Sequence, residues 1–373
     1  MNELTKQPDY QLMREVIQRI ATGPELSKDL SEEQAEQAMR LVLEQSIDPV
    51  QSAIFLIALR MKRETDEENL GVLKAIQAAT AHYSVDIEDL VDIFEPYNGY
   101  IRSSPISAFV PCILSACGLP AYSHGVELVG PKYGITHEQL FKVAGIDVSL
   151  SVEQAASRIS NPEVGWTYLS QSQFCAPLKA LDELRHKMVK RSVLTTVEGL
   201  AGALKATGNT HLVTGYVHKA YPRIYLDLAK AMSYHSALVL RGVEGGIVPG
   251  LRQAAKFHRY FDDELASGEI DPGTISINSQ QRAVTMPDNV DIDSGLALSS
   301  EQRQELAKAI LDQGQAVLSG QDKGLARSAL IYSTALILWH CGKAENLVNA
   351  RALAISAIDS GKAQHRFDAA ING

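Results

Sequence analysis

Apolar residues recur with helical spacing through the first eighty residues of the chain. The segment DLSEEQAEQAMRLVLEQ places apolar residues three and four apart after an acidic first turn, and DPVQSAIFLIALRMKRETDEENLGVLKAIQAAT contains two more such stretches. Asp48 and Thr65 stand immediately before these two stretches, at positions typical of helix N-caps. The pattern predicts a compact helical domain over residues 1–88.

From residue 89 the pattern changes to short apolar runs that alternate with helical segments. The runs are VDIFEP, LPAYSHG, IDVSLS, 211–217 and 236–240, and the helical segments between them include SAFVPCILSACG, THEQLFKVAG and 223–232. Such alternation is typical of a parallel sheet covered by helices. Residues 270–295 are polar and extended, and two helices, SSEQRQELAKAILDQG and 328–340, follow. We therefore expect an α/β domain with a mainly parallel central sheet over 89–373, and helices near 178–205 that pack back onto the helical domain.

Composition excludes several classes of protein. Hydrophobic residues make up 45% of the chain and charged residues 21%, which is ordinary for a globular protein. The four cysteines form no CxxC pair, so neither a zinc ribbon nor a disulfide framework is indicated and no metal site is expected. The first residues carry charges and no apolar signal run, and no uncharged stretch is long enough to span a bilayer. We expect a cytoplasmic protein without a membrane partner.

The charge distribution is more informative than the net charge of -9. Residues 179–259 contain 13 Lys and Arg against five Asp and Glu, together with five of the ten His. A basic middle third in an acidic chain favours contact with an anionic ligand, and a solvated mixed surface is the alternative.

Three segments in order resemble one known family. FLIALRMKRETDEE at 55–68, SAFVPCILSACGLPAYSHG at 107–125 and GKAENLVNARALAISAIDSGKA at 342–363 are similar to segments of the anthranilate phosphoribosyltransferases. The resemblance covers nearly the whole chain. It implies a small helical domain and a large α/β domain, the fold that this family shares with pyrimidine nucleoside phosphorylases.

The ligand motifs of that family are altered in this chain. Glu95-Pro96-Tyr97-Asn98-Gly99 replaces the GTGGD turn that receives phosphoribosyl pyrophosphate, and Ser123-His124-Gly125-Val126 replaces KHGN. Ile247 and Val248 stand where two carboxylates would hold magnesium. We therefore expect no cofactor, and magnesium only if the chain is an active transferase. The resemblance leaves these candidates for an anion or substrate site: Asn98, Gly99, Arg102, Ser104, His124, Gly125 and Arg185.

These replacements resemble a divergent branch of the family that carries PSYNG and VHGV at the same places. The resemblance implies nucleic-acid binding by a homodimer with a basic groove. Lys187, Lys190 and Arg191 are spaced i, i+3 and i+4, so they would share one helix face. Further candidates for phosphate contacts are Lys219, Arg223, Arg241, Lys256 and Arg259.

Two enzymatic alternatives remain. The first is phosphoribosyl transfer to anthranilate, as in tryptophan biosynthesis, which needs a pyrophosphate cradle and magnesium ligands. The second is chemistry on another nucleoside-like substrate, in which Arg102, Ser104 and His124 would bind a phosphate or phosphoribosyl ligand. Fold alone does not decide among these functions. The chain contains no P-loop, HExxH or GxSxG motif, so the sequence favours neither an NTPase nor a hydrolase.

Overall fold

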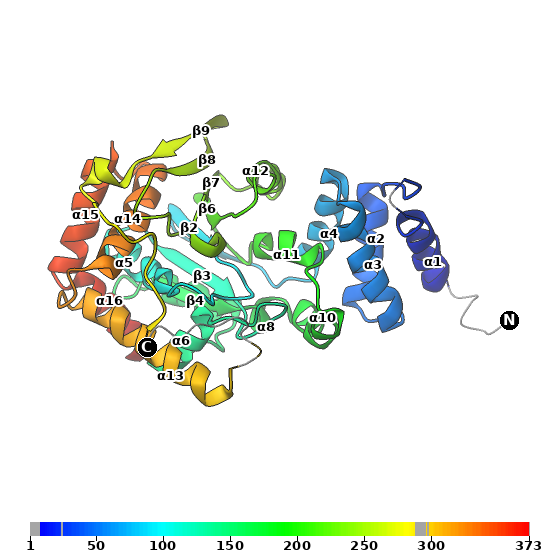
Figure 1. Ribbon diagram of the computed structural model, residues 1–373, viewed down its shortest axis with the longest axis horizontal. Coiled ribbons are helices and arrows are strands. Elements are labelled where there is room, and N and C mark those ends of the chain that lie inside the picture. The colour runs from blue at the N-terminus through cyan, green and yellow to red at the C-terminus, as the bar shows by residue number, and fades with distance from the viewer. Residues whose placement is uncertain (1–7, 24, 288–295, 297, 373) are drawn as a thin grey trace. The chain divides into compact units, whose positions relative to one another are not determined.

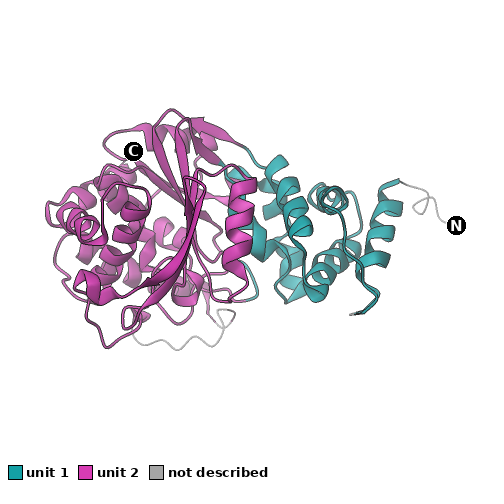
Figure 2. Cartoon of the chain, turned by 90° about the horizontal axis from the view of Figure 1, so that it is seen from above, with its two compact units in different colours: residues 1–81, 129–131, 174–203 teal, residues 82–128, 132–173, 204–373 magenta. Residues whose placement is uncertain are grey.

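The computed structural model describes residues 8–23, 25–287, 296 and 298–372. The chain forms two compact units, shown in different colours in Figure 2. We call them the helical unit (residues 1–81, 129–131 and 174–203) and the α/β unit (residues 82–128, 132–173 and 204–373). The segment 174–203 therefore belongs with the N-terminal helices, although nearly a hundred residues separate them in the sequence.

Four helices build most of the helical unit, and three of them have an N-terminal side-chain cap. Ser31 and Thr65 each form a capping box, and Asp48 caps the helix that begins with a first-turn proline. The helices are α1 Pro8–Ile20, α2 Glu32–Leu43, α3 Pro49–Lys62 and α4 Asp66–Ala78, and the later segment adds α9 Ala176–Lys179, α10 Asp182–Met188, α11 Leu194–Val197 and the 3-10 turn η3 Glu198–Leu200. Met13, Phe55 and Leu59 are among the side chains fully buried in this unit.

The α/β unit is built on a seven-stranded sheet with the order β4-β3-β2-β6-β7-β8-β9. The first five strands are parallel, and β8 and β9 add an antiparallel hairpin at one edge. The strands are β2 Asp89–Phe94, β3 Ala121–Gly125, β4 Trp166–Ser170, β6 Asn209–Gly215, β7 Ser236–Leu240, β8 Ala255–Phe261 and β9 Glu264–Ile270; β1 Tyr83–Val85 and β5 Leu204–Ala206 pair separately. The mainly parallel α/β fold expected from the sequence is confirmed.

Helices cover the sheet because successive strand residues face opposite sides. Val91 and Ile93 of β2 belong to the main apolar core, where α5, α14, α15 and α16 gather (Figure 1), whereas Asp92 between them faces the other side. The helices of this unit are α5 Val110–Ala116, α6 His137–Ala144, α7 Val152–Ser160, α12 Tyr221–Ala231, α13 Ser300–Leu318, α14 Leu325–His340, α15 Leu347–Asp359 and α16 Lys362–Asn372, with the short turns η2 Ile106–Phe109, η4 Val243–Gly245 and η5 Pro272–Ile275, and α8 Gln171–Phe174 at the unit boundary.

One part of the sheet differs from the pattern-based expectation. The apolar run at 146–151 forms no strand but leads into α7, whose N-cap is Ser151, and the sheet position is taken by β4 instead. Residues 270–287 contain no α-helix, as expected, while 288–295 of that predicted segment lie outside the described residues. Among the described residues, no helix is both long and apolar enough to cross a bilayer.

Candidate functional site

The order of the strands marks one place in the α/β unit where a ligand crevice is expected. From β2 the chain proceeds to β3 and β4 on one side, and it later adds β6 and β7 on the other side. In open parallel sheets, such a reversal of direction leaves a crevice at the carboxyl ends of the central strands. The loop that follows β2, residues 95–103, starts at this reversal. It contains Gly99, whose positive φ of 74° favours glycine.

The chain's own side chains pack at this reversal. One small cavity beside this loop is lined by Tyr97, Tyr100 and Tyr168 and holds about 10 Å³, enough for one water molecule. The loop after β7 packs against the loop after β2. A Cβ at Gly246 would collide with the Tyr100 hydroxyl and the Glu95 carboxylate. The loops after β2 and β7 therefore meet at the strand reversal.

A buried chain of hydrogen bonds runs from the sheet to the crevice. Asp92 accepts hydrogen bonds from the hydroxyls of Tyr122 and Tyr234, each at 2.6 Å, and lies 2.9 Å from Nε2 of His124. Because a carboxylate only accepts, Nε2 carries the proton, and in a neutral ring Nδ1 then accepts from the Tyr97 hydroxyl at 2.5 Å. The network fixes the orientation of His124 and directs the phenol of Tyr97 toward the ring and away from a ligand.

Glu95 lies at the end of β2 without an ion-pair partner among the described residues. Its Oε1 accepts a hydrogen bond from the Ile247 N–H at 3.1 Å, and within the described part of the chain Oε2 has no hydrogen-bond partner. Burial raises the pKa of Glu95 to about 7, against the opposing effects of Ile247 N–H and the Ser107 hydroxyl. The carboxyl group can therefore remain protonated near neutral pH.

The carboxylate of Glu244 is the best-coordinated anion near this crevice. Its Oε1 accepts hydrogen bonds from the N–H groups of Arg102 and Ser103, both at 2.8 Å, and from the Ser103 hydroxyl at 3.0 Å. Its Oε2 accepts from Ile101 N–H at 3.3 Å and lies 2.6 Å from Nζ of Lys132. These donors lower the pKa of Glu244 despite its partial burial.

The structure brings six of the seven predicted anion-site residues together around the crevice. Asn98, Gly99, Arg102 and Ser104 lie in the loop after β2, and His124 and Gly125 end β3. Their groups are engaged with the protein: the Ser104 hydroxyl donates to Gln313 Oε1 at 3.1 Å, and only the side chain of Arg102 is exposed. Arg185 instead lies in the helical unit, where it forms two 2.7 Å hydrogen bonds to Glu198.

Magnesium does not fit the residues at this place. Ile247 is fully buried and Val248 is apolar, so neither supplies the oxygen ligands that the ion requires. Glu244, which is nearby in the loop, is already bound by Lys132 and three backbone N–H groups. Across the described ranges, no three His, Cys, Asp or Glu side chains are grouped as metal ligands.

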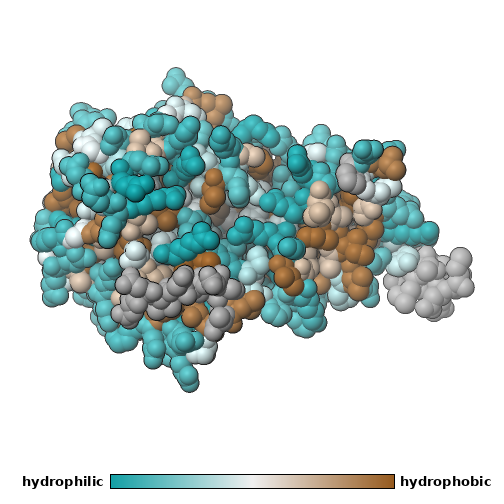
Figure 3. All heavy atoms as spheres, in the orientation of Figure 1, coloured by the Kyte–Doolittle hydropathy of each residue, from teal (hydrophilic) through white to brown (hydrophobic). Residues whose placement is uncertain are grey.

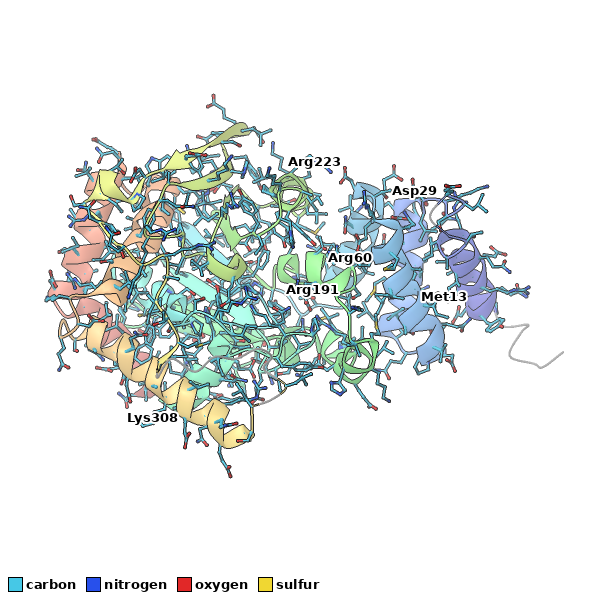
Figure 4. All side chains as sticks on the ribbon, in the orientation of Figure 1. Met13, Asp29, Arg60, Arg191, Arg223 and Lys308 are labelled. Atoms are coloured by element: carbon cyan, nitrogen blue, oxygen red, sulfur yellow. The ribbon has the colours of Figure 1, made fainter. Side chains whose placement is uncertain are left out.

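The predicted nucleic-acid contacts are divided between the two units. Lys187, Lys190 and Arg191 are exposed on the helical unit, but the expectation that they share one helix face is wrong. Helix α10 ends at Met188 and Val189 has a positive φ of 61°, so Lys190 and Arg191 follow the helix, while Lys187 pairs with Glu183 at 2.6 Å. In the α/β unit the candidates lie at the strand ends and on α12; Figure 4 labels Arg191 and Arg223, one from each unit. Arg223 pairs with Asp227 at 2.8 Å, Lys256 approaches Glu269 at 3.6 Å, and Arg259 lies 4.4 Å from the ring of Trp339.

Three important residues were not anticipated from the sequence as site residues. Glu244 occurs in a glycine-rich loop that the sequence indicates only as a turn, and Lys132 lies in a segment without a recognisable motif. Asp92 occupies a central strand position, where its carboxylate accepts from two tyrosines. The one signal in the sequence that could have identified Asp92 is a carboxylate in the middle of an otherwise apolar strand, because a buried charge requires hydrogen-bonding or charged partners.

Both units resemble domains of known proteins. Residues 14–80 match the model of a glycosyl transferase family helical bundle domain, and residues 101–364 match that of a glycosyl transferase family a/b domain. An anthranilate phosphoribosyltransferase of Clostridium kluyveri is 26% identical over 365 residues, which is 97% of this chain and 99% of that protein. An uncharacterized protein of Aquifex aeolicus is 24% identical over 320 residues, covering 86% of this chain and 90% of its own length.

Solved structures show the same fold. The anthranilate phosphoribosyltransferase of Thermus thermophilus has a TM-score of 0.73 at 17% identity, and the match covers 97% of this chain and 98% of that one. The enzyme of Saccharomyces cerevisiae, solved in complex with PRPP and Mg, has a TM-score of 0.75 at 15% identity, with coverage of 96% and 98%.

Proposed function

Because this chain belongs to the glycosyl transferase family, with both the helical bundle and the α/β domain of the anthranilate phosphoribosyltransferases, we propose that it is a member that binds nucleic acid through exposed cations and carries out no phosphoribosyl transfer. The contact between the loops after β2 and β7 supports the second part of this proposal, since Tyr100 and Glu95 lie against Gly246 at the strand reversal. The lack of fit for magnesium supports it independently.

The observation that carries nucleic-acid binding is that each unit has exposed cations without acidic partners among the described residues. Lys190, Arg191, Lys219 and Arg241 are all exposed, and no ion pair within the described residues includes them. Each such cation can neutralise a phosphate and release a counterion, which is the main source of sequence-independent affinity for nucleic acid.

The loops of the α/β unit add aromatic groups to these cations. Arg241 N–H donates to Lys256 O at 2.9 Å, which sets the two cationic residues beside each other across β7 and β8. The ring of His218, next to Lys219, lies 6.2 Å from that of Tyr221. Cations beside partly exposed rings are typical of surfaces that contact the backbone and bases of nucleic acids.

Titration with short oligonucleotides tests the proposal. The triple variant Lys187→Ala, Lys190→Ala and Arg191→Ala should weaken binding to unrelated sequences about equally. Each phosphate contact that is lost should reduce the slope of log K against log salt by roughly 0.7 to 0.9, because about one counterion is released at each contact. Measurements at about 50 and 200 mM salt, a range over which such contacts lose much of their affinity, give the slope.

Arg40→Ala is the matched control. Arg40 is an exposed cation of the same unit, and it pairs with Glu44 four residues later as Lys187 pairs with Glu183. The control should bind like the parent protein. Absence of binding at the lower salt, or equal affinity of the triple variant and the parent, would contradict nucleic-acid binding by these residues.

A second candidate function is phosphoribosyl transfer to anthranilate, favoured by relatives of that name that match almost the full chain. The assay combines anthranilate, phosphoribosyl pyrophosphate and magnesium and follows the loss of anthranilate fluorescence. We expect no turnover. A rate on the order of 1 per second, which is ordinary for an enzyme, would establish the second candidate in place of the first.

A further inference from the structure

A surface cavity lies at the opposite end of the central sheet from the crevice. Its volume is about 490 Å³, which is within the range of pockets that bind small molecules. Gly118, which precedes β3, and Glu163, which precedes β4, line one side of it. Both residues stand at the amino ends of strands, whereas the loops that form the crevice follow the carboxyl ends of β2 and β7. The cavity is therefore separate from the site described above.

Helix α16 supplies basic side chains to this cavity. Lys362, His365 and Arg366 all line it, and their spacing of i, i+3 and i+4 places them on one face of the helix. The helix begins at Lys362, so the positive end of its dipole lies at the same place. Because α16 packs against α5 and β4, the position of this face within the α/β unit is fixed.

The guanidinium of Arg366 has an unsatisfied donor. Its Nη1 is shielded from solvent, yet it has no hydrogen-bond partner within the described part of the chain. The residue is held in place, because its backbone carbonyl accepts a hydrogen bond from Nε1 of Trp166 at 2.9 Å. A buried donor without an acceptor raises the free energy of the folded chain, and most such donors in proteins are paired. An acceptor atom of a ligand would supply the missing bond.

The lining carries more positive than negative charge. Lys362 is exposed and forms no ion pair in the described ranges of the chain. The carboxylate in the lining belongs to Glu163, whose side chain is 71% exposed and lies 3.9 Å from Nδ1 of His365. The ammonium of Lys362 and the guanidinium of Arg366 outnumber this carboxylate, so the cavity favours an anion.

The size and charge of the cavity fit a phosphorylated small molecule. Guanidinium and ammonium groups bind phosphate through charge-assisted hydrogen bonds, and an arginine can bind two phosphate oxygens at once. A phosphate ion alone would fill only part of the cavity. The space beside Gly118 is open, because a Cβ there would meet no atom within 4 Å. Glu163 can accept hydrogen bonds from hydroxyl groups in the rest of such a molecule.

We propose that Lys362, His365 and Arg366 bind the phosphate group of a small phosphorylated molecule. The hydroxyl-bearing part of that molecule lies toward Glu163 and Gly118. This site goes beyond the proposed nucleic-acid function and does not depend on it, because the cavity is lined by none of the cations assigned to nucleic acid.

Isothermal titration with glucose 6-phosphate tests the proposal. The parent chain should bind it saturably and should not bind glucose, which lacks the phosphate. Lys362→Met and Arg366→Met should each weaken binding by about tenfold or more, because each removes a charge-assisted contact. Lys308→Met is the matched control: Lys308 is an exposed lysine of the same unit, paired with Asp312, and its variant should bind like the parent.

Arg366→Lys keeps the charge and loses the planar fork, so its affinity should fall between those of the parent and Arg366→Met. Lys362 is exposed, and Lys362→Met therefore decides the question if Arg366→Met does not fold. Binding that Lys362→Met leaves intact would place the ligand elsewhere and overturn the proposal. Equal weakening in Lys308→Met would also overturn it, because the effect would then be one of net charge.

Inorganic phosphate, titrated separately, distinguishes two sources of the phosphate group. Tighter binding of glucose 6-phosphate supports a phosphorylated molecule as the ligand, whereas equal affinity overturns that part and leaves the free ion. If neither probe binds the parent, the proposal is overturned, and an oligonucleotide that then binds through Lys362 and Arg366 assigns these cations to nucleic acid. Because both probes are titrated without nucleic acid, failure of nucleic-acid binding leaves this test unaffected.

Discussion

Buried histidines make the stability of the folded chain sensitive to acid. Burial lowers the pKa of His137 to about 3, lowers that of His211, and lowers that of His340 well below its usual value. Below about pH 6.5 the unfolded chain binds protons at these imidazoles that the folded chain does not, so each group lowers the free energy of unfolding as the pH falls. For His137, whose pKa is lowered to about 3, the loss is about 1.4 kcal/mol per pH unit. We expect the free energy of unfolding to fall as the pH is lowered from 7 to 5.

Glu95 acts in the opposite direction over the same range. Its pKa is raised to about 7, so the folded chain binds a proton that the unfolded chain lacks, and acid favours folding through this group. The effect of three histidines outweighs that of one carboxyl group, so the net free energy of unfolding falls as the pH is lowered. Urea unfolding at pH 7, 6 and 5 measures it, and His137→Gln should reduce the slope. A free energy that rises with acid would show that Glu95 dominates.

Arg185 is expected to stabilise the helical unit and not to bind a ligand. Its guanidinium and the Glu198 carboxylate are both more than nine-tenths buried. Arg185→Met leaves that carboxylate without its partner, which costs about 3–5 kcal/mol. Unfolding followed by far-ultraviolet circular dichroism measures the loss, and the exposed Arg191→Met is the control, expected within about 0.5 kcal/mol of the parent. Equal stability of the two variants would contradict this role.

The sequence located the candidate site but not its contacts. Asn98, Gly99, His124 and Gly125 could be placed at strand ends because apolar runs and turn residues are local signals. The bond between Tyr97 and His124 joins residues 27 apart, and that between Ser103 and Glu244 joins residues 141 apart. Such pairings depend on strand order, which no local pattern specifies. For this reason the contacts within the crevice could not be predicted.

Helix α3 has an exposed apolar stripe that supports the expected homodimer. Val50, Ile54 and Met61 are 65%, 37% and 77% exposed, and their spacing places them on one side of the helix. Figure 3 shows apolar side chains gathered on the helical unit over α2 and α3. Exposed apolar patches of this kind mark association surfaces. The homodimer itself stays a prediction.

Sedimentation at micromolar concentration tests the dimer. The parent chain should sediment as a dimer, and Ile54→Glu should shift it to a monomer because a buried unpaired charge is costly. Val348→Glu changes an exposed valine of the α/β unit and should leave the dimer intact. A monomeric parent chain would contradict the prediction, as would an unchanged dimer of Ile54→Glu.

At the scale of elements, the sequence predicted most of the longer helices and most parallel strands but neither α7 nor the sheet edges. The pattern was sufficient to predict strands β2, β3, β6 and β7, because they are short apolar runs bounded by turns. Strand β8, AKFHRYF, has mostly partly exposed residues without a clear alternation, and it carries Lys256, His258 and Arg259. Its cations therefore indicated a charged surface, and the segment was not predicted as a strand. Strand β4 is fully buried on both faces, and without alternation a five-residue run is ambiguous.

For the whole molecule, two compact units imply that unfolding need not be a single transition. The two units have separate cores: Met13 and Phe55 belong to the helical unit, and the cluster around Val91 and Leu238 belongs to the α/β unit. A change confined to one core should lower the stability of that unit first. Arg185→Met is such a change, since both Arg185 and Glu198 lie in the helical unit.

The placement of the two tryptophans allows separate unfolding of the two units to be followed by tryptophan fluorescence. Trp166 stacks on Phe367, and Trp339 lies against Phe257. Both tryptophans therefore belong to the α/β unit, and the helical unit contains no tryptophan. Fluorescence therefore reports on one unit, whereas circular dichroism reports on helices of both. In Arg185→Met, ellipticity should be lost at a lower temperature than the emission changes. Coincident curves would mean that the two units melt together, and the chain would then have a single melting temperature on either instrument.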